Sequence, residues 1–282
     1  MNHDSPASIR AFLESRDIAP RKRWGQNFLI NRGAREKIIG FLDVRPGTIV
    51  WEIGPGLGAM SESLLASGAD LTVFEIDPAY CEWLRESLGP RGLKLIEGDV
   101  SGTWRGQWEI RKPGRILGNL PYNAASAIIA AFIESGKLPE VSVFTVQDEM
   151  GRRMTASPGT KDYSSFSILC QTSANVVDGG RLSPGSFYPA PRVHSRIIRL
   201  EPAAPHGEIR RPEEFRLLVR SLFSSRRKTL SNNIAAASMR KGFPQADRVR
   251  DAFAGAGIDL TRRPETVSPA EWVAVSNGIV RA

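Results

Sequence analysis

The chain has 282 residues, a formal net charge of +8 at pH 7, 41% hydrophobic residues and 24% charged residues. This length and composition allow one large folded domain with a smaller one, and they exclude a low-complexity chain. The basic balance favours a polyanionic partner, most simply a nucleic acid. Only two cysteines and three histidines occur, and none has the spacing of metal ligands. We therefore expect neither a disulfide framework nor a metal site.

The positive charge is concentrated near the C-terminus. Residues 206–282 carry 14 Lys and Arg against 8 Asp and Glu, whereas residues 1–205 carry 24 against 22. No apolar stretch approaches the length of a membrane span, and the N-terminus lacks the apolar core of a signal peptide. We expect a cytoplasmic protein without a membrane partner, whose basic element is its C-terminal quarter.

In chain order, residues 1–24 are expected to form a polar arm with a short helix, ending in the basic run Arg21, Lys22 and Arg23. Strands are then predicted at 48–53, 71–75, 93–96, 115–118, 141–146 and 195–200, and helices between them near 59–66, 78–88 and 124–133. Strands that alternate with helices predict a mainly parallel sheet, and the late strands are expected to form an antiparallel edge.

Residues 200–212 are rich in proline and polar side chains and are predicted to be a linker. Beyond them, Phe215, Leu218, Val219 and Leu222 have the i, i+3, i+4, i+7 spacing of a helix face. Further helices are expected near 228–238, 247–254 and 269–280. The patterns predict an α/β Rossmann-like domain over residues 1–205 and a small all-helical domain over residues 206–282.

A glycine-rich turn runs from Glu52 to Gly58, between a predicted strand and a predicted helix. Glycines such as Gly54 let the backbone turn tightly and approach a ligand closely. Glu75 ends the next strand, where a carboxylate can accept hydrogen bonds from ribose hydroxyls, and Asp99 ends the third strand. The turn by itself suits a nicotinamide cofactor as well as S-adenosylmethionine. Glu52, suited to a cationic methionine group, and Asp99, suited to an adenine amine, favour S-adenosylmethionine.

The fourth strand is followed by the motif Asn119-Leu120-Pro121-Tyr122. The Asn119 side-chain oxygen and the Leu120 carbonyl can accept the two hydrogens of an adenine amino group, and Tyr122 offers a stacking face. A second aromatic residue, Phe187, lies in a proline-rich loop that could hold a ring against a flipped-out base. Phe187 suits a core position almost equally well. The order of the two motifs predicts an enzyme that methylates adenine, mainly by positioning and electrostatics.

These motifs closely resemble those of the KsgA family, the small-subunit ribosomal RNA adenine dimethyltransferases. The resemblance runs from about Arg21 to near the C-terminus. Its further motifs are Gly25-Gln26-Asn27-Phe28-Leu29, Phe74-Glu75-Ile76-Asp77, Gly98-Asp99, Phe187-Tyr188-Pro189-Ala190-Pro191 and Arg226-Arg227-Lys228-Thr229-Leu230. The resemblance implies a class I S-adenosylmethionine-dependent methyltransferase that acts on an assembling small subunit. It would place two methyl groups on each of two adjacent adenines near the 3′ end of the small-subunit (16S) RNA. Nothing in the sequence suggests more than a monomer, so we expect a monomer.

The resemblance also implies which residues do this. Cofactor contacts are expected from Asn27, Leu29, Gly54, Glu75, Asp99 and Asn119, and contacts with the target adenine from Asn119, Leu120, Tyr122 and Phe187. Asp148 and His194 depart from the family pattern, in which a lysine and an aspartate are usual, and no function is carried onto them.

Two basic runs are predicted to contact RNA phosphates: Arg21, Lys22 and Arg23, and Arg226, Arg227 and Lys228. The first run could equally be a solvated charged face, and part of the second could be structural, because arginine stems cover apolar surface. Three other functions stay open. They are a large-subunit RNA methyltransferase of the antibiotic-resistance type, a nicotinamide-dependent oxidoreductase, and an assembly factor without catalytic activity.

Overall fold

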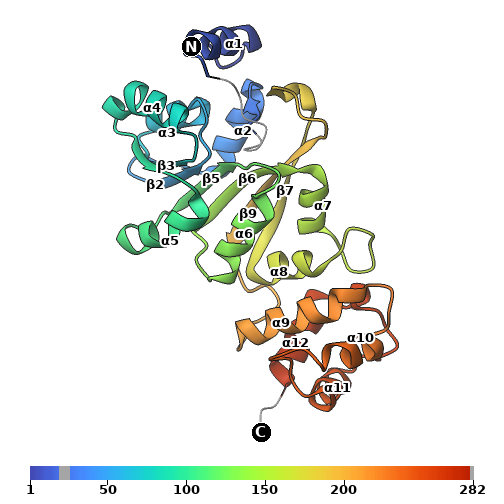
Figure 1. The fold of residues 1–282 in the computed structure, drawn as a ribbon. Coiled ribbons are helices and arrows are strands. Elements are labelled where there is room, and N and C mark those ends of the chain that lie inside the picture. The colour runs from blue at the N-terminus through green and yellow to red at the C-terminus, as the bar shows by residue number, and fades with distance from the viewer. Residues whose placement is uncertain (19–25, 280–282) are drawn as a thin grey trace. The chain divides into compact units, whose positions relative to one another are not determined.

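The computed structural model describes residues 1–18 and 26–279. The predicted basic run Arg21, Lys22 and Arg23 therefore lies outside the described residues. The chain forms two compact units, one of Met1–Gly151 with Val177–Pro202 and one of Arg152–Val176 with Ala203–Ala282 (Figure 1). Residues 152–176 thus pack with the C-terminal helices, although they fall inside the range predicted as the first domain. The assignment of functions to residues 1–205 and 206–282 stays a prediction.

The first unit is built on a twisted sheet with the strand order β4-β3-β2-β5-β6-β9-β7. Its strands are β2 (Ile49–Ile53), β3 (Asp70–Glu75), β4 (Lys94–Glu97), β5 (Arg115–Asn119), β6 (Val141–Gln147), β7 (Ala174–Leu182) and β9 (Ser195–Pro202). Neighbouring strands pair in parallel in the series β4, β3, β2, β5 and β6, and β9 pairs antiparallel to β6. The predicted parallel sheet and its antiparallel late strand are confirmed.

Helices cover both faces of this sheet (Figure 1). They are α2 (Arg32–Leu42), α3 (Ala59–Ala66), α4 (Pro78–Ser87), α5 (Val100–Ile110) and α6 (Ala125–Glu134). Val50 and Trp51 of β2 face opposite sides and are both buried. Val50 belongs to the core beneath α2 and α3, and the Trp51 ring lies 5.8 Å from that of Trp108 on α5. A strand buried on both faces is mostly hydrophobic, which is the usual pattern in parallel sheets, and Glu52 is the exception in β2.

Two further segments of this unit lie beside the sheet. Helix α1 (Pro6–Ser15) buries Ile9 and Leu13 against Leu57 and Tyr80. Strands β1 (Phe28–Leu29) and β8 (Phe187–Tyr188) pair antiparallel, with Leu29 opposite Phe187. The short helix expected in residues 1–24 is present as α1. Both segments pack near the glycine turn, so the N-terminal segment is part of the folded unit and not only a polar arm.

The second unit is helical. It contains the end of α7 (Asp148–Thr155), and α8 (Ser165–Ser173), α9 (Pro212–Leu222), α10 (Leu230–Ala237), α11 (Ala246–Gly255) and α12 (Pro269–Gly278). The four helices predicted after residue 212 are all present. Tyr163 and Ile168 lie in the same core as Phe215 and Trp272, and the Tyr163 hydroxyl donates to the Val267 carbonyl at 2.9 Å.

Candidate active site

The glycine turn joins β2 to α3 in the way that its sequence predicts. Gly54 and Gly56 have φ values of +68° and +57°, a region that other residues rarely adopt. A Cβ at Gly56 would come 3.2 Å from the Phe28 ring. The turn also lies where the strand order reverses, because β3 and β4 extend from one side of β2 and β5 lies on the other. Ligands of open α/β sheets bind at this point, outside the carboxyl ends of the strands.

Glu75 ends β3 beside this turn. Its side chain accepts backbone N–H bonds from Gly56 at 3.2 Å and from Ile76 and Asp77 at 2.9 Å. Burial raises the pKa of Glu75 to about 7, although these three N–H donors act to lower it. Asp99 follows β4, is exposed, and caps α5 by accepting from the Ser101 N–H at 2.8 Å. The two carboxylates thus end neighbouring strands, as expected.

Glu52 is placed differently from what the sequence suggests. It is completely buried, and its Oε2 accepts a hydrogen bond from the Ser61 hydroxyl at 2.5 Å. Its Oε1 has no hydrogen-bond partner among the described residues. Burial raises the pKa of Glu52 to about 7, and the charge of Glu75 acts in the same direction. Glu52 supports the turn from beneath and is not part of the pocket wall.

Asn119 ends β5, and its amide is held in one orientation. The Nδ2 group donates to the Asn27 carbonyl at 2.9 Å, and a carbonyl can only accept. The Asn119 Oδ1 is therefore the acceptor that remains for a ligand. This bond joins two motifs that are 92 residues apart in the sequence.

A single pocket in the first unit brings the predicted cofactor residues together. Residues of the glycine turn, β1, and the ends of β3, β4 and β5 line it. All six predicted cofactor residues are among the lining residues: Asn27, Leu29, Gly54, Glu75, Asp99 and Asn119. His3 and Ile9, from the N-terminal segment, also line it. The sequence gives no local signal for these two residues, because neither belongs to a motif.

The predicted adenine-binding residues differ in burial and in their position relative to the pocket. Leu120 is 2% exposed, and its N–H donates to the Thr145 carbonyl at 3.2 Å, which fixes the start of the loop. Tyr122 is partly buried, and its hydroxyl lies 2.6 Å from the Ser195 hydroxyl. Phe187 is 3% exposed within the core and is not part of the pocket lining. Of these residues, the structure brings only Asn119 to the pocket wall.

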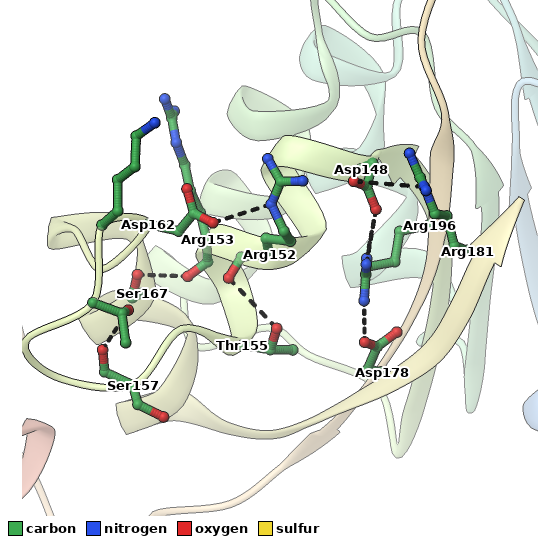
Figure 2. A network of polar contacts seen from close by, with 12 residues as sticks. Asp148, Arg152, Arg153, Thr155, Ser157, Asp162, Ser167, Asp178, Arg181 and Arg196 are labelled. Atoms are coloured by element: carbon green, nitrogen blue, oxygen red, sulfur yellow. Dashed lines mark hydrogen bonds and ion pairs between the residues drawn. The ribbon is translucent and has the colours of Figure 1, made fainter.

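The two departures from the family pattern lie side by side. The Asp148 N–H donates to the His194 carbonyl at 2.9 Å. Figure 2 shows Arg196 between two carboxylates, with its Nε donating to Asp148 at 2.9 Å and its Nη1 paired with Asp178. The ion pair with Arg196 on β9 therefore explains the acidic residue at position 148.

The second basic run divides into two parts. The Arg226 guanidinium donates to Glu265 at 3.0 Å and to the Lys161 carbonyl at 2.8 Å, and so it joins loops within the second unit. Arg227 and Lys228 are exposed. The predicted phosphate contacts of all three residues stay predictions, and the exposed side chains of Arg227 and Lys228 are better placed to reach a phosphate than that of Arg226.

Residues 1–18 and 26–279 contain no group of three His, Cys, Asp or Glu side chains placed to hold a metal ion. None of the helices in these ranges combines the length and the apolar character needed to cross a bilayer.

The doubly wound sheet, the glycine turn and the acidic residues that end β3 and β4 define a Rossmann-like domain that binds a nucleotide-containing cofactor, the fold class of class I S-adenosylmethionine-dependent methyltransferases. The chain belongs to the ribosomal RNA adenine dimethylase family, whose model matches residues 19–277. Family membership confirms the predicted class of enzyme and its methyl donor. The oxidoreductase and the assembly factor without activity, both left open by the sequence, are thereby set aside.

Similar proteins support this assignment. The "Ribosomal RNA small subunit methyltransferase A" of Borreliella burgdorferi (strain ZS7) is 42% identical over 98% of this chain and 95% of its own. A crystal structure of a dimethyladenosine transferase from Plasmodium falciparum has a TM-score of 0.71 at 24% identity, covering 87% of this chain and 94% of that one. The crystal structure of the 23S rRNA methyltransferase ErmE has a TM-score of 0.66 at 24% identity, covering 90% and 99%. At this level of identity the two structures show the fold alone.

Proposed function

We propose that this protein transfers methyl groups to two adjacent adenines near the 3′ end of small-subunit (16S) ribosomal RNA, two on each base, during assembly of the small subunit. The observation that carries the proposal is the position of Asn119. Its Oδ1 is left as an acceptor on the wall of the pocket that contains all six predicted cofactor residues. The 42% identity to a protein named as the small-subunit enzyme favours that substrate over large-subunit RNA.

The pocket residues suit S-adenosylmethionine chemically. The absence of a side chain at Gly54 lets a ligand approach the end of β2, where the Asn119 carbonyl oxygen is the nearest atom, 3.8 Å from where a Cβ would lie. Glu75 offers carboxylate oxygens for the ribose hydroxyls, and Asp99 can accept the adenine amine of the cofactor. Asn27 and Leu29 cover the pocket from β1 and the residues before it. When bound, S-adenosylmethionine supplies a methyl group on a positively charged sulfur.

The target adenine needs help because its amino nitrogen has a lone pair delocalised into the ring. We infer that Asn119 Oδ1 and the Leu120 carbonyl accept the two amino hydrogens and so favour a pyramidal nitrogen with an available lone pair. Once the nitrogen is alkylated its proton is acidic, so no strong base is required before attack. Tyr122 would stack on the base. Phe187 is the weaker candidate for the opposite face of the base, because its ring is buried in the core and does not line the pocket.

The remaining assignments belong to the same proposal. Residues 1–205 carry the transfer of the methyl group, and residues 206–282 contact RNA or the ribosomal particle, with Arg227 and Lys228 as exposed candidates for phosphate contacts. Arg226 and the run Arg21, Lys22 and Arg23 are kept as further candidates. The protein acts as a monomer in the cytoplasm.

The test uses immature small subunits that lack the methyl groups. The protein is incubated with them and with labelled S-adenosylmethionine, and the labelled nucleotides are mapped. We expect label on two adjacent adenines near the 3′ end of the small-subunit RNA. Large subunits treated in the same way serve as the control. Label that appears only in large-subunit RNA, or label in neither particle, would refute the proposal.

A further inference from the structure

The hydroxyl groups of Ser195 and Tyr122 meet although the two residues are 73 positions apart. Their oxygen atoms are separated by 2.6 Å, which is a short distance even for a bond between two hydroxyls. Ser195 is the first residue of β9 and is completely buried. Tyr122 belongs to the loop that follows Asn119. The bond therefore connects this loop to a strand on the far side of β6.

The strand that carries Ser195 is firmly held. Ser195 pairs with Gln147 of β6 in the antiparallel register. On one side of it, the His194 carbonyl accepts from the Asp148 N–H, and on the other Arg196 bridges Asp148 and Asp178 (Figure 2). A side chain supported in this way is a fixed reference point, and such support is what holds a functional group in a productive position.

Tyr122 is held less firmly. The turn that contains it is closed by bonds from the Ala124 and Ala125 N–H groups to the Pro121 carbonyl, but these bonds fix the backbone and leave the ring free to rotate. Burial raises the pKa of the Tyr122 phenol above its ordinary value, so the hydroxyl stays neutral and can pair with that of Ser195. The hydrogen bond to Ser195 holds the outer end of the ring.

A buried serine does not by itself indicate such a role. Ser142, on β6, is also completely buried, and its hydroxyl has no hydrogen-bond partner among the described residues. The protein therefore tolerates an unpaired serine hydroxyl in the same sheet. The difference between the two serines lies in the partner of Ser195, a tyrosine within the Asn-Leu-Pro-Tyr motif.

We propose that Ser195 is a positioning residue that acts through Tyr122 and sets the orientation of the tyrosine ring on which the target adenine stacks. This inference rests on the proposed function. A ring that rotates away from its productive orientation leaves the amino group misaligned with the methyl donor, and small misplacements of this kind lower the rate of transfer. Binding of the ribosomal particle, which depends mainly on phosphate contacts, should change little.

The experiment compares Ser195→Ala, Tyr122→Phe, the double variant and Ser142→Ala, all as full-length protein with unmethylated small subunits. Each single variant at the pair removes one hydroxyl and with it the same bond. Because a side-chain hydrogen bond contributes a net free energy equivalent to about a fivefold change, kcat should fall about fivefold in each. The double variant should show the same fivefold loss. The KM for subunits and the cofactor Kd should stay within about twofold, and Ser142→Ala should match the parent.

Three results would overturn the inference: an unchanged kcat in Ser195→Ala, losses that multiply to about 25-fold in the double variant, or a parallel loss of cofactor affinity. If Ser195→Ala does not fold, Tyr122→Phe still decides, because unchanged kcat in that variant contradicts the role of the bond. A parent protein that leaves small subunits unmethylated refutes the proposed function itself. An active parent with independent effects at the two positions refutes only the role of Ser195.

Discussion

The orientation of the Asn119 amide determines that its oxygen, and not its nitrogen, is left to meet a substrate amine. A terminal amide has a donor side and an acceptor side, and the Asn27 carbonyl occupies the donor side. A segment near the N-terminus therefore decides which atom of Asn119 can meet a substrate amine. This makes Asn119 an acceptor that is oriented before the substrate arrives, which is the condition under which electrostatic stabilisation is most effective.

Replacement of Asn119 by alanine tests this role. We expect Asn119→Ala to lower kcat about 100-fold, because it removes an acceptor aimed at the reacting nitrogen. The cofactor Kd should rise by less than about tenfold, since the other pocket contacts remain. Single-turnover methylation and calorimetry would measure the two effects. Asn232→Ala, which removes an exposed amide in the second unit, is the control and should have normal activity. A near-normal kcat in Asn119→Ala would contradict the assignment.

Glu75 should make cofactor affinity depend on pH. Its pKa is raised to about 7 by burial, so a large fraction of the free protein carries a protonated Glu75 at pH 6. Ribose hydroxyls donate to the ionised carboxylate and stabilise it, so binding lowers this pKa and releases a proton. The cofactor affinity should therefore rise between pH 6 and pH 8, by up to about tenfold for each unit below 7.

Calorimetry in two buffers with different ionisation enthalpies would measure both the affinity and the released proton. Glu75→Gln should bind more weakly and lose most of the pH dependence. Glu82→Gln, at an exposed position of α4, is the matched control and should behave like the parent. If the parent shows the same affinity at pH 6 and pH 8, the ionisation of Glu75 is not linked to binding.

Helix α1 shows how an apparently accessory segment becomes part of the site. Its sequence predicts a polar arm, yet Ile9 and Leu13 are 1% and 3% exposed. Arg35 pairs with Asp4 and also donates to the Leu29 carbonyl at 2.7 Å. These contacts tie the N-terminal segment to β1, which itself lines the pocket.

Deletion of residues 1–17 should therefore weaken cofactor binding. It removes the part of the pocket wall formed by His3 and Ile9, and we expect the cofactor Kd to rise at least about tenfold through lost apolar contact. Equilibrium binding would be compared with that of Glu14→Gln, which changes an exposed residue of the same helix. An unchanged Kd in the deletion variant would show that α1 does not contribute to the pocket.

The sequence predicts the helices and strands whose apolar residues repeat with a clear period, or whose ends are marked by glycine or proline. The sequence does not predict strand β7, because Gly179 and Gly180 interrupt it and glycine in a strand normally indicates a bend. In the structure, a Cβ at Gly179 would come 2.7 Å from the Phe41 ring and 2.8 Å from Ile197. The glycine is there for close packing against residues distant in sequence, which no local pattern reveals. The sequence does not predict helix α5 for a similar reason, because Gly102 and Gly106 lower its helix propensity.

In the candidate site, too, residues within sequence motifs can be predicted and residues placed by long-range contacts cannot. Residues within motifs were found from the sequence, and all six predicted cofactor residues line one pocket. Ser195, His3 and Ile9 were not singled out, because their positions depend on contacts between segments far apart in the chain. Glu52 shows the reverse difficulty. Its place before the glycines suggests a ligand contact, but strand alternation turns its side chain into the core, where Ser61 binds it.

The distribution of charge agrees with methyl transfer by residues 1–205 and RNA contact by residues 206–282. Residues 206–282 carry most of the net positive charge, whereas the rest of the chain is nearly balanced. Some of these basic residues are used within the protein: Arg226 joins loops through Glu265 and Lys161, and Arg262 pairs with Glu271 at 2.6 Å. Net charge therefore overstates the number of cations available to RNA, and the exposed residues Arg227 and Lys228 are the better candidates.

The dependence of RNA binding on salt would test these two residues. Each phosphate contact releases counterions, so the double variant Arg227→Gln/Lys228→Gln should reduce the slope of log K against log salt by about one to two. Affinity should fall by a similar factor for unrelated RNA sequences, because phosphates carry no sequence information. Arg226 is left intact, since its loss would disturb the loop that Glu265 holds.

The control is Arg105→Gln/Lys112→Gln, which removes the same charge from two exposed residues of the first unit. This variant should keep the slope of the parent, because residues 1–205 have almost no excess charge to attract RNA. Equal slopes for the parent and the Arg227 and Lys228 variant would remove these residues from the interface. Equal reductions in both variants would show instead that only net charge matters, and that no local patch in the C-terminal unit contacts the phosphates.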